Sequence, residues 1–185
     1  MQILSYFVLF LYSSSILLIF FYGLAQFNLL LNYLKSKKQN DNSEKFDFKN
    51  SEEIPFVTIQ LPIFNEKYVV ERLLSTISKL EYPREKLEIQ VLDDSMDDSI
   101  FETKKLIEDL QKTGLDIKHV LRKNRVGFKA GALKEGLEIA KGEFIAIFDA
   151  DFLPQKDWLF QTVPYFKNEK IGVVQTRWGH LNRDY

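Results

Sequence analysis

Two aspartates, Asp149 and Asp151, stand one residue apart at the end of the apolar run Glu143–Phe148. The run predicts a strand buried on both faces, which would fix the two carboxylates at a strand end where they repel each other. A divalent cation relieves such repulsion, because Mg²⁺ and Mn²⁺ prefer oxygen ligands, often carboxylates together with substrate phosphates. The pair therefore predicts a metal site. The alternative is an acidic turn with solvated carboxylates.

A basic loop occupies residues 122–129 and contains four cationic side chains, those of Arg122, Lys123, Arg125 and Lys129. The free backbone N–H groups at the start of a following helix would add to their attraction for a diphosphate. Gly127 and Gly131 would let that backbone come close to a ligand. The alternative is an ordinary solvated loop.

A second acidic cluster follows the apolar run Leu87–Leu92. Asp93 and Asp94 come first and can accept hydrogen bonds from the N–H of a base or from a ribose hydroxyl. Asp97 and Asp98 lie at the predicted start of a helix, where carboxylates favour the helix macrodipole. That structural role is the alternative for the whole cluster.

These clusters depend on a regular alternation of strands and helices in the second part of the chain. Strands are predicted at Phe56–Leu61, Leu87–Leu92, Ile117–Leu121, Glu143–Phe148 and Gly172–Gln175. Helices are predicted at 66–80, 97–110, Phe128–Ala140 and 155–166. The alternation predicts an α/β fold, with a mostly parallel sheet and helices on both sides. Ligands of such sheets bind outside the carboxyl ends of the strands, so the clusters are expected to converge there.

Three local signals predict where these helices begin and end. Asn65 is suited to cap the start of the first helix, and Ser99 with Glu102 has the spacing of a capping box at the second. Gly142 is suited to the C-terminal cap of the third.

The first 34 residues have a different character, because all 25 basic and 26 acidic side chains lie after Leu34. The run Ile3–Leu24 supplies the roughly 20 apolar residues that a helix needs to cross a bilayer. A signal peptide fits less well, since no basic residue precedes the run and the run is long. Lys35, Lys37 and Lys38 follow at once, and the positive-inside bias then places the remainder in the cytoplasm.

The chain is therefore divided into a transmembrane anchor at 1–34, a polar linker at 35–53 and a cytosolic domain at 54–185.

The net charge of −1 gives no support to nucleic-acid binding, which usually needs a basic excess. The chain has no cysteine, which excludes disulfides, thiolate metal sites and cysteine nucleophiles.

Five ordered motifs carry a resemblance that covers Ile54–Tyr185. They are LPIFNE at 61–66, VLDDSMDD at 91–98, RKNRVGFKAGAL at 122–133, IFDADFLP at 147–154 and VVQTRW at 173–178. In this order they resemble the membrane-bound family 2 glycosyltransferases of the cellulose-synthase-like kind, most closely the mannan, glucomannan and glucan synthases. The resemblance implies a GT-A-like fold, a UDP- or GDP-sugar donor, a glycan acceptor and Mg²⁺ or Mn²⁺.

The resemblance also implies roles for individual residues. Asp93 and Asp94 would lie in the nucleoside-binding motif. Lys129 would approach the donor diphosphate, with Arg125 near it. Asp149 and Asp151 would form the D-x-D motif, with Asp151 as the direct metal ligand. Three residues would border the acceptor, namely Gln175, Arg177 and Trp178.

The sequence departs from the family in the motifs that would complete catalysis. Family members carry a later T/S-E-D motif with the general base and then a Q-x-x-R-W motif, and neither occurs here. Gln175–Trp178 reads Q-x-R-W, which is one residue short. We therefore expect an N-terminal fragment that holds the donor half of an inverting polysaccharide synthase and is inactive alone. The alternative is a membrane-anchored nucleotide-sugar-binding module without catalysis.

Overall fold

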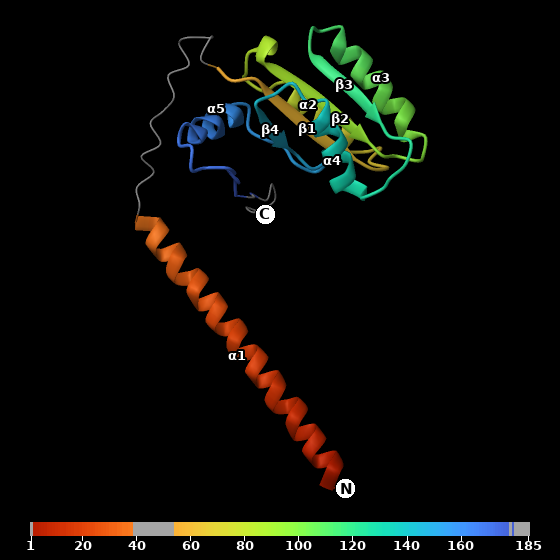
Figure 1. Cartoon of the computed structure of the whole chain (residues 1–185). Coiled ribbons are helices and arrows are strands. Elements are labelled where there is room, and N and C mark those ends of the chain that lie inside the picture. The colour runs from red at the N-terminus through yellow and green to blue at the C-terminus, as the bar shows by residue number, and fades with distance from the viewer. Residues whose placement is uncertain (1, 39–53, 178, 180–185) are drawn as a thin grey trace, which may run out of the picture. The chain divides into compact units, whose positions relative to one another are not determined.

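The computed structural model describes residues 2–38, 54–177 and 179, which fall into two units. The first unit contains the helix α1 (Gln2–Lys38) (Figure 1). Its stretch Gln2–Lys35 is long and apolar enough to cross a membrane, and its side chains are exposed on every side. A helix that is apolar all round suits a lipid environment. The helix continues to Lys38, so the start of the predicted linker is helical, while residues 39–53 lie outside the described residues.

The second unit is built on a four-stranded parallel sheet in the order β3-β2-β1-β4 (Figure 1). The strands are β1 (Val57–Ile63), β2 (Leu87–Asp93), β3 (Asp116–Leu121) and β4 (Phe144–Ile147). In the register, Ile59 of β1 lies opposite Ile89 of β2 and Ala146 of β4. The predicted α/β fold with a parallel sheet is confirmed.

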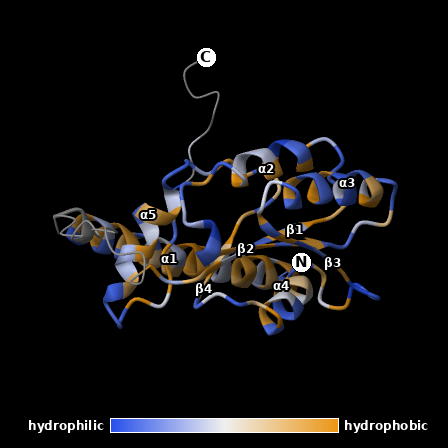
Figure 2. Cartoon of the chain, turned by 90° about the horizontal axis from the view of Figure 1, so that it is seen from above, coloured by the Kyte–Doolittle hydropathy of each residue, from blue (hydrophilic) through white to orange (hydrophobic). Residues whose placement is uncertain are grey.

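Helices cover both faces of the sheet (Figure 2). One face carries α2 (Val70–Ile77) and α3 (Ser99–Gln111), and the other carries α4 (Phe128–Glu138). The remaining elements are the short helix α5 (Trp158–Thr162) and the 3₁₀ turns η2 (Arg84–Lys86) and η3 (Val163–Lys167). The main hydrophobic core lies under α2 and α3, where Ile59 and Leu61 meet Leu73, Leu74 and Ile77.

The opposite face of the sheet, under α4, is unusually polar. Thr58 and Gln60 of β1 and Glu88 and Gln90 of β2 are all buried there. The Glu88 carboxylate accepts hydrogen bonds from Thr58 Oγ1 at 2.7 Å, Lys118 Nζ at 2.6 Å and the backbone N–H of Lys141 at 2.9 Å. Burial by itself raises the pKa of such a carboxyl, but these hydrogen bonds outweigh it and hold the pKa of Glu88 below its usual range.

Two strand predictions were wrong. Residues 172–175 form no strand in the described part of the chain. The fourth strand is shorter than predicted, and the side chain of Ile147 is 48% exposed, so it is not buried on both faces. The reason is that β4 forms an edge of the sheet that residues 54–177 build, and burial at an edge depends on neighbours rather than on the strand's own composition.

The three predictions of helix caps were also wrong. The N-cap of α2 is Val69, and Asn65 lies further upstream with a positive φ of 55°. Ser99 is already inside α3, where its N–H and hydroxyl both bond to Asp97 Oδ1. The C-cap of α4 is Ile139, while the N–H of Gly142 donates to Thr58 Oγ1. Asn65 and Gly142 make tertiary contacts in place of the predicted caps, with Met96 and Thr58, whereas the contact of Ser99 with Asp97 is local.

Candidate functional site

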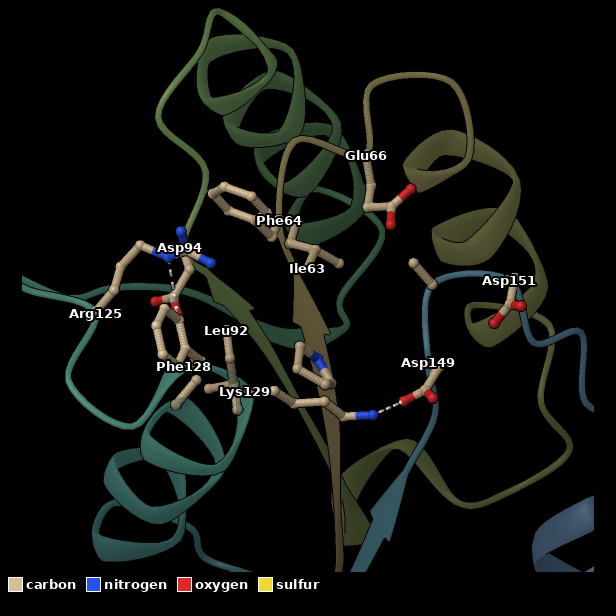
Figure 3. A pocket seen from close by; sticks show the side chains of 13 residues that line it. Ile63, Phe64, Glu66, Leu92, Asp94, Arg125, Phe128, Lys129, Asp149 and Asp151 are labelled. Atoms are coloured by element: carbon tan, nitrogen blue, oxygen red, sulfur yellow. Dashed lines mark hydrogen bonds and ion pairs between the residues drawn. The ribbon is translucent and has the colours of Figure 1, made fainter. Parts of the chain in front are cut away.

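A cleft of about 440 Å³ lies at the carboxyl ends of the strands (Figure 3). Its walls come from the segment after β1, the end of β2, the start of α4 and the segment after β4. The lining residues are Pro62, Ile63, Phe64, Glu66, Leu92, Asp94, Arg125, Phe128, Lys129, Ala132, Asp149, Ala150 and Asp151. The prediction that the clusters at the strand exits converge at this edge is therefore confirmed.

The acidic side of the cleft is formed by Asp149 and Asp151, as the D-x-D spacing predicts. The ammonium group of Lys129, from the first turn of α4, forms an ion pair with Asp149 across the cleft (Figure 3). Asp151 forms no ion pair within residues 54–177, and Glu66 and Asp94 bring the number of carboxylates in the lining to four. The cleft thus holds one neutralised and one free carboxylate of the pair.

The opposite wall combines Asp94, Arg125 and two aromatic rings. The guanidinium carbon of Arg125 lies 3.5 Å from the ring centroid of Phe64 and 5.5 Å from that of Phe128. Arg125 Nε is 3.8 Å from Asp94 Oδ2 and is buried without a hydrogen-bond partner among the described residues. This wall offers a cation on an aromatic surface, an arrangement suited to an anionic or planar ligand.

Asp93 and Asp94 are adjacent, but they point in different directions. Asp94 lines the cleft, whereas Asp93 is buried beside β3, with its Oδ2 2.8 Å from His119 Nε2. Burial raises the pKa of the Asp93 carboxyl, but hydrogen bonds from His119 and Ser95 outweigh it and leave the pKa lowered. Asp93 therefore supports the end of β2 instead of facing the cleft.

The sequence matches the family model described as glycosyl transferase family 2 over residues 58–184. The chain belongs to this family. It is 41% identical over 167 residues to glucomannan 4-beta-mannosyltransferase 1 of Cyamopsis tetragonoloba, a match that covers 84% of this chain and 31% of that protein. It is 44% identical over 138 residues to glucomannan 4-beta-mannosyltransferase 9 of Arabidopsis thaliana, which covers 70% of this chain and 25% of that protein. The chain thus spans about a quarter to a third of these relatives.

Solved structures agree with the family 2 assignment. A mannosyltransferase from Pyrobaculum calidifontis, in complex with GDP-Man and Mn²⁺, is 32% identical, with a TM-score of 0.61 over 77% of this chain and 41% of that chain. Residues 1–349 of S. aureus TarS are 24% identical, with a TM-score of 0.52 over 62% of this chain and 32% of that chain, which shows the fold alone. The expected GT-A-like fold is confirmed.

The described carboxylates fit a divalent cation only if other ligands join them. Residues 2–38, 54–177 and 179 contain no group of three or more acidic or histidine side chains placed to hold a metal unaided. Two exposed carboxylates on a short segment after a strand are nevertheless the oxygen donors that Mg²⁺ and Mn²⁺ accept when substrate phosphates complete the shell.

The family 2 cleft differs from the sequence-based site in several residues. Gln175 and Arg177 lie on an exposed segment and do not line it, while Trp178 lies outside the described residues. The cleft is also lined by Phe64, Glu66 and Phe128, which were not predicted as site residues. Only their position after a strand or in a loop could have indicated this role. That signal is weak for the two phenylalanines, because aromatic side chains at such places more often belong to a core.

Proposed function

We propose that this chain forms the donor site of an inverting glycosyltransferase that transfers a sugar from a nucleoside diphosphate to a growing β-mannan or β-glucan. The observation that carries the proposal is the single cleft that brings Lys129, Asp149 and Asp151 together opposite Asp94 and Arg125. A diphosphate needs cationic partners, and a sugar nucleotide also needs a wall for its base. The mannosyltransferase relatives and the GDP-Man complex favour a guanosine diphosphate donor.

In the proposed reaction, an acceptor hydroxyl attacks the anomeric carbon while the bond to the nucleoside diphosphate breaks. Lys129 binds the diphosphate and thereby leaves Asp149, so that Asp149 and Asp151 can hold a divalent cation. When bound, that cation neutralises the charge that develops on the departing diphosphate. The acceptor hydroxyl gives its proton to a general base, and we assign that role to none of the described cleft residues.

A panel of nucleotides tests this proposal on the chain reconstituted in nanodiscs. Calorimetry with GDP, UDP and ADP, each with Mn²⁺ or Mg²⁺, should show saturable binding, with GDP the tightest. The chain by itself should incorporate no sugar from GDP-mannose or UDP-glucose into a glycan, because the T/S-E-D and Q-x-x-R-W motifs do not occur in it. Failure of every nucleoside diphosphate to bind would contradict the donor site. Glycan synthesis by this chain alone would contradict the expectation that it holds only the donor half of the site.

The binding of nucleoside diphosphate should depend on metal. We expect GDP to bind at least about tenfold more tightly with Mn²⁺ than without it, which is about 1.4 kcal/mol. The physical reason is that the diphosphate brings further negative charge to a place that already holds two carboxylates. Asp151→Asn should remove most of this metal dependence, as measured by calorimetry with and without Mn²⁺.

A matched control is Asp157→Asn, because Asp157 precedes α5 and does not line the cleft. This variant should retain the full effect of Mn²⁺. Metal-independent binding that also survives Asp151→Asn would refute the metal assignment.

We also propose that α1 anchors the chain in a membrane with residues after Lys35 on the cytoplasmic side. The absence of charged residues before Lys35 and the lysines that follow support this orientation. In sealed vesicles, protease added from the extracytoplasmic side should leave residues 54–185 intact, and detergent should make them accessible. Digestion of this domain in intact right-side-out vesicles would contradict the proposed orientation and indicate the opposite one.

A further inference from the structure

Arg122 belongs to the basic loop in the sequence, but the structure places its side chain in the interior. Its side chain is only 4% exposed, and it does not line the cleft. Nε donates to Asp94 Oδ1 at 2.8 Å, and one terminal nitrogen donates to Asp94 Oδ2. Both carboxylate oxygens of Asp94 are therefore held by the guanidinium fork of one arginine.

The remaining donors of Arg122 reach the loop that leads into α4. The two terminal nitrogens donate to the backbone carbonyls of Val126 and Phe128, each at 3.0 Å, and to Glu135 Oε1 at 3.3 Å. A guanidinium has five N–H donors, and here all five have acceptors. Arg122 thus connects Asp94 on one wall of the cleft with the loop that precedes Lys129.

The loop needs such a connection because its backbone is strained. Gly127 and Phe128 both have positive φ, 74° and 48°, and for a phenylalanine this conformation is costly. The carbonyls that Arg122 holds belong to Val126 and Phe128, on either side of Gly127. Gly131 packs so closely under this turn that a Cβ there would lie 2.0 Å from the Val126 carbonyl oxygen. The first turn of α4, which carries Lys129, is therefore positioned by these contacts.

We propose that Arg122 is a positioning residue of the donor site, which sets Asp94 and the 126–129 segment in the arrangement that binds a nucleoside diphosphate. It acts without touching the ligand. The inference rests on the proposed function, because it assumes that the cleft binds such a ligand. It predicts that the geometry of the guanidinium matters and that its charge alone does not suffice.

Arg122→Lys tests this distinction, since lysine keeps the charge but has three donors on a single nitrogen and cannot form the planar fork. We expect the affinity for GDP with Mn²⁺ to fall at least about tenfold, at unchanged binding stoichiometry and well below the unfolding temperature. A purely structural role would lower the unfolding temperature and leave the affinity of the folded protein unchanged. The matched control is Glu135→Gln, which alters one contact of Arg122 outside the cleft and should change the affinity by less than about twofold.

A second measurement keeps the inference testable if Arg122→Lys does not fold. Asp94→Asn removes the charged acceptor of Arg122, which also holds the carbonyls of Val126 and Phe128. We therefore expect faster hydrogen exchange at the amides of residues 123–129. Unchanged exchange in Asp94→Asn, or unchanged GDP affinity in Arg122→Lys, would overturn the inference. If the unmodified chain bound no nucleoside diphosphate at all, the proposed function itself would fail.

Discussion

Replacing Lys129 with alanine should lower the affinity for GDP in the presence of Mn²⁺ by about 10- to 100-fold, the range that one hydrogen bond to a charged group contributes. Lys129 lines the cleft from the first turn of α4 and reaches across to Asp149. A bound diphosphate would meet this ammonium together with the free N–H groups of the helix start. Calorimetry with GDP and Mn²⁺ measures the effect.

Lys123→Ala is the matched control, because Lys123 belongs to the same basic loop but does not line the cleft. Its substitution should change the affinity by less than about threefold, the value expected for a distant exposed charge. Equal losses in the two variants would mean that the loop attracts phosphate only through its general charge.

Lys129→Ala should have the opposite effect on the binding of Mn²⁺ in the absence of nucleotide. Without nucleotide, Lys129 neutralises Asp149 and repels a cation, so its removal should raise the affinity for Mn²⁺ by about two- to fivefold, as expected for an exposed ion pair. Titration of Mn²⁺ in the absence of nucleotide measures this change. A weaker affinity for Mn²⁺ in Lys129→Ala would contradict the competition between lysine and metal for Asp149.

Replacing Glu88 with alanine should lower the free energy of unfolding of the second unit by about 1–3 kcal/mol, the usual cost of leaving a buried hydrogen-bonding group without its partner. Glu88 is completely buried, and its loss would leave Lys118, Thr58 and the Lys141 N–H without their acceptor. Urea unfolding followed by tryptophan fluorescence isolates this unit, because Trp158 lies within it and residues 1–38 contain no tryptophan.

Glu85→Ala is the control for Glu88→Ala. Glu85 is exposed in the turn before β2, so its substitution should lower the free energy of unfolding by less than about 0.5 kcal/mol.

The pH dependence of the free energy of unfolding gives a further check on Glu88. The folded pKa of Glu88 is lowered, so its stabilisation is present above the unfolded value of 4.5 and is lost as the pH falls through the folded pKa. Glu88→Gln should therefore weaken the acid dependence of stability. An unchanged acid profile would contradict this role.

Local sequence patterns were sufficient to predict the order of the elements. Four of the five predicted strands and all four helical segments are present, the last as the short helix α5 followed by a 3₁₀ turn. These features depend on hydrophobic periodicity and on short connections, which are properties of neighbouring residues. In a parallel sheet they also determine which loops meet at the carboxyl edge. The cleft, with Asp149, Asp151 and Lys129 in it, could therefore be predicted before the structure.

The tertiary structure decided which member of each charged cluster faces the cleft. Successive side chains of an extended segment point in opposite directions, so the partner of each depends on the strand or loop beside it. Asp93 meets His119 of β3, while Asp94 faces the cleft and is held by Arg122. Composition could not separate Arg122 from Arg125, because one is buried by contacts with residues far along the chain and the other lies on the ring of Phe64.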